Sequence, residues 1–160
     1  MVKFLFLLLF AATVSAQDCD MLDVHYDKMD NRSAKTIKKR FAISESGNKG
    51  FIIDFLKPGD VIWSIDVIGG PSKCIDKGAK VQVLFEDDTR ITLTSINDFN
   101  CKGSCVIYFG SNFGNEYELS LFRTKKVVSM RVYTTSGYLH EDLDDITSTK
   151  LMNTFDCISK

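Results

Sequence analysis

The chain has 160 residues, with 20 basic and 21 acidic side chains and a formal net charge of −1 at pH 7. Such a balance gives no broad attraction to nucleic acid or to an anionic membrane surface, so we expect neither as a partner. The chain holds only two prolines and no repeat, linker or low-complexity tract, which predicts one continuous domain.

The first 16 residues have the three parts of a secretory signal peptide. Lys3 supplies a positive start, residues 4–12 form an unbroken apolar run, and Val14-Ser15-Ala16 offers the small residues that precede a cleavage site. The apolar run is shorter than the roughly 20 residues that span a bilayer. We therefore expect cleavage near Ala16, a soluble mature domain of residues 17–160 without a membrane span, and a secreted or periplasmic location.

Strand patterns dominate the first part of the mature chain. Residues 18–30 fit either a helical stripe or a short strand at Val24–Tyr26, and we favour the strand. Residues 35–44 predict another strand, whose basic residues 38–40 are explained better by a solvated strand edge than by a nucleic-acid site. Residues 50–56 predict a third strand, which a type II turn at Lys57–Asp60 would follow.

Alternation of apolar and polar residues continues through the centre of the chain. Residues 61–68 place Val61, Trp63, Ile65 and Val67 on one face of a strand. Residues 80–85 and 90–96 predict a hairpin around the polar turn at 86–89. Residues 116–121 and 128–133 alternate in the same way and predict two further strands.

The C-terminus changes to a helical period. One helical stripe collects the apolar residues Leu143, Ile146, Leu151, Met152, Phe155 and Ile158. Asp142, Asp144 and Asp145 suit the start of this helix, although Thr147 or Ser148 could equally cap a shorter one. The whole pattern predicts a mainly β fold, an antiparallel β-sandwich or partly open barrel with one C-terminal α-helix packed over an edge or end.

The five cysteines, at positions 19, 74, 101, 105 and 157, all lie in the mature chain. Export favours disulfides, and the odd number leaves one thiol unpaired or intermolecular. Lys-Gly-Ser between Cys101 and Cys105 is turn chemistry, with Gly103 free to adopt positive φ, so we predict a Cys101–Cys105 disulfide that staples a turn. A bond from either residue to a distant cysteine such as Cys74 is the alternative, and a second bond would form among Cys19, Cys74 and Cys157.

No motif predicts catalysis, a cofactor or a metal ion. A Ser-His-Asp or Cys-His system would need His25 or His140, and His140 does not begin a zinc-protease motif, since position 144 is Asp. The glycine patterns of phosphate and dinucleotide sites do not occur. The acidic segments lack the spacing of a calcium loop, and Cys101 and Cys105 lack a second cysteine pair to complete a zinc site.

We therefore expect a non-enzymatic binding or structural domain whose partner would be an envelope or extracellular protein. The best candidate contact loop is 109–115, where Phe109 and Phe113 stand among glycines, although Phe113 packed in the core is the simpler alternative. Two other functions are kept open. One is a small secreted hydrolase whose acidic or histidine side chains meet only in three dimensions, and the other is a secreted inhibitor that presents a disulfide-braced loop to a protease.

Three stretches carry a resemblance to a known set of proteins: YDKMDNRSAKTIKKRFAIS at 26–44, VQVLFEDDTRITL at 81–93 and MRVYTTSGYLHEDLDDITSTKLMNTFDC at 130–157. They resemble small exported proteins of unknown function from Bacteroidetes. In that set a YT-x-x-GY turn follows the last strand and precedes a helix that ends in a cysteine, places held here by Tyr133-Thr134, Gly137-Tyr138 and Cys157. The chain departs at Asp87-Asp88, where Asp-Gly is usual. The resemblance implies a β-rich exported domain and no activity.

Overall fold

The computed structural model describes residues 19–29, 31–44, 48–69, 73–111 and 113–160. The predicted signal peptide, residues 1–16, lies outside this part of the chain. The described elements are β1 Leu22–Asp27, β2 Arg32–Ile37, β3 Phe41–Ile43, β4 Gly50–Lys57, β5 Val61–Ile68, β6 Lys80–Phe85, β7 Arg90–Thr94, β8 Ser104–Phe109, α1 Glu116–Thr124, β9 Val127–Thr134, β10 Gly137–Asp142 and α2 Asp145–Ser159.

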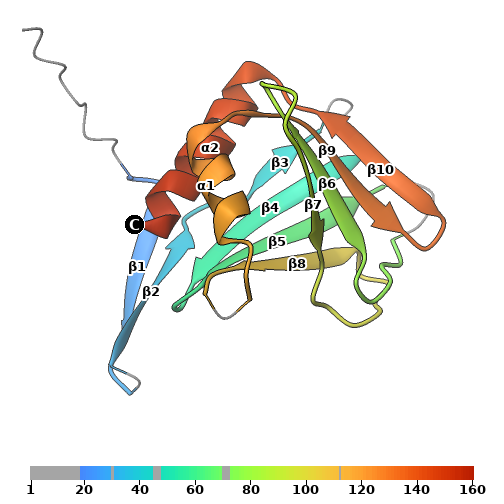
Figure 1. The fold of residues 1–160 in the computed structure, drawn as a ribbon. Coiled ribbons are helices and arrows are strands. Elements are labelled where there is room, and N and C mark those ends of the chain that lie inside the picture. The colour runs from blue at the N-terminus through green and yellow to red at the C-terminus, as the bar shows by residue number, and fades with distance from the viewer. Residues whose placement is uncertain (1–18, 30, 45–47, 70–72, 112) are drawn as a thin grey trace, which may run out of the picture.

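The strands form two antiparallel sheets. One sheet has the order β1-β2-β4-β5-β8, with β3 also paired to β4, and the other has the order β10-β9-β6-β7. The chain leaving β7 links the sheets along one side, where the N–H of Ile96 donates to the Val106 carbonyl of β8 at 2.9 Å. The described strands do not close into a barrel. The predicted mainly β, antiparallel sandwich with a C-terminal helix is therefore confirmed (Figure 1).

The core lies between the two sheets, and the period of two in the sequence predicts much of it. On β5 the predicted face of Val61, Trp63, Ile65 and Val67 is buried. Aromatic rings fill the end of the core that the helices cover, and those in mutual contact are Phe55, Trp63, Phe85, Phe109, Phe122 and Phe155. Their burial removes a large apolar area from water and is the main source of stability in this fold.

The C-terminal helix α2 begins directly after Asp144. The Asp144 carboxylate accepts a hydrogen bond from the Thr147 N–H at 2.6 Å, which satisfies one free N–H of the first turn. This hydrogen bond lowers the pKa of Asp144. Asp144 and Asp145 thus mark the helix start as predicted, whereas Asp142 ends strand β10 and Leu143 precedes the helix. The alternative of a shorter helix capped by Thr147 or Ser148 is wrong.

The strand predicted at 116–121 is wrong, because this segment is the helix α1. It carries Glu116 and Glu118 in its first turn and Arg123 in its last, the charge order that a helix dipole favours. Its buried residues Leu121 and Phe122 are adjacent in sequence, which an alternating strand could not bury on one face. The Phe122 ring stacks on Phe155 of α2 with ring centroids 4.3 Å apart, so the two helices lie side by side across one end of the sheets (Figure 1).

Four smaller predictions have different outcomes. The favoured strand near Val24–Tyr26 is confirmed as β1, and the strand expected at 35–44 is divided into β2 and β3. The predicted type II turn at Lys57–Asp60 is wrong, because Gly59 does not have the positive φ that such a turn requires. A type II turn would also splay the two strands of a hairpin. Strand β10 begins at Gly137-Tyr138, where the resemblance implies a turn that leads into the helix.

Two disulfides join the described cysteines, and neither is the predicted Cys101–Cys105 staple. Cys74 bonds to Cys101, and Cys19 bonds to Cys157. A turn does form, since the Asn100 side chain accepts hydrogen bonds from the N–H groups of Lys102 and Ser104, and Gly103 has a φ of 81°. Cys105, however, already belongs to β8, whose alternation directs its thiol into the core, away from the exposed Cys101. The staple prediction is therefore wrong, and Cys105 is the unpaired thiol.

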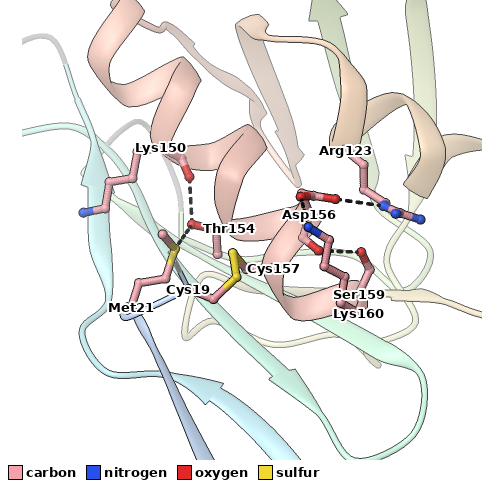
Figure 2. The surroundings of a disulfide bond; sticks show 9 residues. All are labelled: Cys19, Met21, Arg123, Lys150, Thr154, Asp156, Cys157, Ser159 and Lys160. Atoms are coloured by element: carbon pink, nitrogen blue, oxygen red, sulfur yellow. Dashed lines mark hydrogen bonds and ion pairs between the residues drawn. A yellow bond between two sulfur atoms is a disulfide. The ribbon is translucent and has the colours of Figure 1, made fainter. Parts of the chain in front are cut away.

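The Cys19–Cys157 bond ties the start of β1 to the last turn of α2 (Figure 2). Beside it, the Thr154 hydroxyl lies 3.3 Å from the sulfur of Met21. Asp156 of α2 joins the two helices, because its carboxylate lies 3.5 Å from Arg123 of α1. The same carboxylate lies 2.6 Å from Lys160 at the end of α2. Two disulfides are typical of proteins in an oxidising, extracytoplasmic compartment.

Candidate functional site

A groove of about 240 Å³ lies on the outer face of the four-stranded sheet, opposite the core. The strand register aligns His140 of β10, Arg131 of β9, Gln82 of β6 and Thr92 of β7 in one row across this face. The next row, toward the β6–β7 turn, holds Ser129, Leu84 and Arg90. The polar side chains of the groove therefore come from the outward half of each strand's alternation, and the lining also includes Val83, Ile91 and Met130 from the inward half.

Arg131 lies at the centre of this groove with few partners of its own. Its guanidinium stacks over the ring of Tyr138, with the central carbon 4.2 Å from the ring centroid. Its Nε is buried and has no hydrogen-bond acceptor. A buried donor without an acceptor costs free energy, so an oxygen atom of a ligand could relieve that cost at this position.

Among the described residues, the two arginines of the groove have no carboxylate within ion-pairing distance. Neither Arg90 nor Arg131 forms an ion pair with a carboxylate in the described part of the chain. The acid nearest to His140, Asp142, contacts the histidine ring at 3.3 Å. Guanidinium groups match the flat, two-oxygen edge of a carboxylate, phosphate or sulfate, and the lining adds donors from Ser129, Gln82 and Thr92.

Aromatic side chains border the same face. Tyr133 and Tyr138 lie opposite each other on β9 and β10, with ring centroids 5.8 Å apart. The Tyr133 hydroxyl donates to Oε1 of Gln82 at 3.2 Å, which fixes the amide at the groove's edge. A ligand that carries a ring or sugar next to its charged group would therefore have flat apolar surface beside the arginines.

Ser129, His140 and Asp142 come together here, but they do not form a catalytic triad. The Ser129 hydroxyl lies 3.5 Å from Nε2 of His140, and the Asp142 carboxylate lies 3.3 Å from the same nitrogen. A triad needs the acid on one ring nitrogen and the nucleophile on the other, so that the acid orients the base. Ser129 is also buried.

The predicted contact residues Phe109 and Phe113 are separated by the structure. Phe109 is fully buried against Trp63, Phe122 and Phe155, so its role as a surface contact is wrong. The alternation of β8 explains this, since Cys105, Ile107 and Phe109 all point inward. Phe113 is 53 % exposed rather than packed in the core, with its ring 4.5 Å from Tyr108 beside a shallow hollow at the β4–β5 turn.

The two histidines do not meet. His25 is exposed on β1 at the edge of one sheet, and His140 lies on β10 of the other sheet. In the residues that the structure describes, no group of three or more His, Cys, Asp or Glu side chains could hold a metal ion. Cys101 cannot supply a zinc thiolate while it is bonded to Cys74.

Sequence reasoning missed the groove although part of its signal was visible. The alternation at 128–133 separates Ser129, Arg131 and Tyr133 from Val128, Met130 and Val132, which identifies one polar face of one strand. The missing step was β10, because the resemblance implies a turn at Gly137-Tyr138 and Asp142 suits a helix start. Without that strand, His140 and Tyr138 could not be placed beside Arg131.

Comparisons of the chain with models of known protein families, with curated proteins and with solved structures found no match. Among the described helices, none is both long enough and apolar enough to cross a membrane.

Proposed function

We propose that this chain is an exported, non-enzymatic binding domain that takes an oxyanionic ligand in the groove over β10, β9, β6 and β7. The ligand class is a small carboxylate, phosphate or sulfate ester, or such a group on a larger envelope or extracellular molecule. The domain would work in the periplasm or outside the cell after removal of residues 1–16. Its membership of the exported Bacteroidetes set stays part of this proposal.

One observation carries the proposal: Arg131 has a buried, unpaired Nε and stands in a groove with a second unpaired arginine, Arg90. Arginines with a structural role usually have acceptors, as Arg40 does with Asp54 at 2.7 Å and Asp66 at 3.5 Å. Two arginines in one groove without a described carboxylate in ion-pairing distance favour an external anion.

Titration calorimetry with matched charged and neutral probes tests this function. We expect the mature protein to bind glucose 6-phosphate and galacturonate, and to bind glucose and galactose at least about tenfold more weakly, a difference of about 1.4 kcal/mol. Arg131→Met should abolish binding of the charged probes. Arg32→Met removes the same charge from β2, on the other sheet, and should leave binding unchanged. Equal affinity for charged and neutral probes, or equal loss in both variants, would contradict the proposal.

A small hydrolase is a second candidate, favoured only by the approach of Ser129 to His140. Because Asp142 contacts the same ring nitrogen, we expect no ester hydrolysis that depends on Ser129. The assay compares p-nitrophenyl ester turnover by the mature protein and by Ser129→Ala. Turnover that is lost in this variant would establish the hydrolase instead.

An inhibitor is a third candidate, favoured by the loop before β8. Phe99 is 60 % exposed there, two residues before Cys101, and the loop is braced by the Cys74–Cys101 bond and by the paired backbones of Ile75 and Asn100. An exposed aromatic side chain on a braced loop suits a protease specificity pocket. Inhibition of a chymotrypsin-like protease that disappears in Phe99→Ala would support this function, and no inhibition across a broad protease panel would remove it.

A further inference from the structure

The hairpin of β1 and β2 extends beyond the body of the molecule, and β1 is the outer strand of its sheet (Figure 1). Val24 and Tyr26 on one face of β1 are 63 % and 57 % exposed. An outer strand with exposed apolar side chains is unusual, because proteins generally protect the edge strands of their sheets.

The backbone of β1 has hydrogen-bonding groups free along its outer edge. The Lys38 N–H donates to the Met21 carbonyl at 2.9 Å, which makes this pair a hydrogen-bonded one. Because antiparallel ladders alternate, Asp23, His25 and Asp27 direct their backbone groups toward β2, and Val24 and Tyr26 direct theirs outward. No described residue pairs with these outward groups.

The edge at the other end of the same sheet is protected. On β8 the Val106 N–H donates to the Ser95 hydroxyl, and the Val106 carbonyl accepts from the Ile96 N–H. The Ser104 carbonyl accepts from Asn97 and Asn100, and the Tyr108 carbonyl accepts from Asn115. Strand β1, with the sequence LDVHYD, has no lysine, proline or covering side chain of this kind.

We propose that β1 pairs with β1 of a second copy of this chain, antiparallel, about a two-fold axis at Val24. Val24 then exchanges both backbone hydrogen bonds with its symmetry mate, and the Tyr26 N–H of each copy donates to the Leu22 carbonyl of the other. The two six-stranded sheets become one continuous sheet across the dimer.

The charges on β1 select this register over its neighbours. With the axis at Val24, Asp23 of each copy lies opposite His25 of the other, and Leu22 lies opposite Tyr26. An axis at His25 would oppose Asp23 to Asp27, and an axis at Asp23 would oppose that carboxylate to itself. Directly opposed like charges destabilise a strand pair, so the register at Val24 is favoured over the two adjacent ones.

Sedimentation equilibrium of the mature, disulfide-bonded protein from micromolar to millimolar concentration tests the dimer. We expect a reversible monomer–dimer equilibrium. Val24→Pro removes an N–H that the β1–β2 ladder does not use, so the hairpin should persist while dimerisation weakens by about tenfold or more. Val24→Thr keeps the N–H and is the matched control, expected to dimerise as the parent chain does.

A charge exchange tests the register. Asp23→Lys should weaken the dimer, and the double variant Asp23→Lys with His25→Glu should restore it, because each lysine then faces a glutamate of the other copy. Near-ultraviolet circular dichroism and the thermal midpoint confirm that each variant is folded. A monomer at every concentration, a dimer unaffected by Val24→Pro, or no recovery in the double variant would each overturn the proposal.

Discussion

At the scale of single residues, the contacts of Arg131 fit a role in binding better than a role in stabilising the fold. A structural arginine stabilises the fold through its acceptors, as Arg123 does through Asp156 of the neighbouring helix. Arg131 instead holds a buried Nε without an acceptor and gains only the contact with the Tyr138 ring. Its place in the fold therefore costs free energy that a bound oxyanion would offset.

Arg131→Met should consequently leave stability unchanged or slightly raised. The methionine keeps most of the apolar stem, the unpaired donor is removed, and the lost cation–π contact is worth about 1 kcal/mol or less. Urea unfolding of the variant and the parent chain measures the change. A loss above about 3 kcal/mol would show that Arg131 is needed for the fold, which contradicts the role given to it here.

Cys105 is the second residue with a specific expectation. Burial raises the pKa of its thiol to about 12, so the thiol stays protonated in the native state at neutral pH. We expect no reaction with Ellman's reagent in the native protein and one reactive thiol per chain after unfolding without reductant. Rapid native labelling, or labelling of a different cysteine, would contradict the disulfide pairing.

The same pKa gives a pH dependence of stability. The thiol ionises more readily in the unfolded chain, where its pKa has the ordinary value near 9. The stability that the protonated, buried thiol contributes is therefore complete below pH 9 and decreases as the pH rises toward 12. Comparison of the parent chain with Cys105→Val by urea unfolding at pH 8 and pH 10.5 isolates this effect. The parent chain should lose more stability than the variant, and equal losses would show that the thiol is not desolvated.

At the scale of elements, most strands were predictable, whereas strand β10 and helix α1 were not. In β5, β6, β7 and β9 the alternation in sequence matches the two faces of each strand, one facing the core and one facing outward. Segment 116–121 shows the same alternation by coincidence, and only the burial of adjacent Leu121 and Phe122 distinguishes it as α1. That burial depends on contacts with Phe85, Phe109 and Phe155, which are distant in sequence.

The disulfides also act at this scale, because each one joins two elements. Cys19–Cys157 closes a separation of 138 residues and Cys74–Cys101 one of 27, so the chain-entropy model gives about 5 and about 3.5 kcal/mol respectively. Urea unfolding of the double serine variants measures both losses. The larger loss of unfolding free energy should follow removal of Cys19–Cys157. A larger loss on removal of Cys74–Cys101 would contradict this prediction.

At the scale of the whole molecule, the two proposed surfaces lie on different sheets. The groove uses the outer face of the four-stranded sheet, and the dimer uses the free edge of the six-stranded one. Dimerisation through β1 therefore leaves the groove open on both copies. The sequence could predict the sandwich, because alternation is local. It could not predict the groove, because that face exists only when β10 is placed beside β9 and the register brings His140 next to Arg131.

The most direct test of the proposed function is a nuclear magnetic resonance titration of the isotope-labelled mature protein with glucose 6-phosphate, with glucose as the neutral control. The proposal predicts saturable shifts of the backbone amides of Gln82, Thr92, Ser129, Arg131 and His140, and no comparable shifts with glucose. Shifts that cluster away from this groove, or that glucose produces equally, would contradict the assignment of the site and of its ligand class.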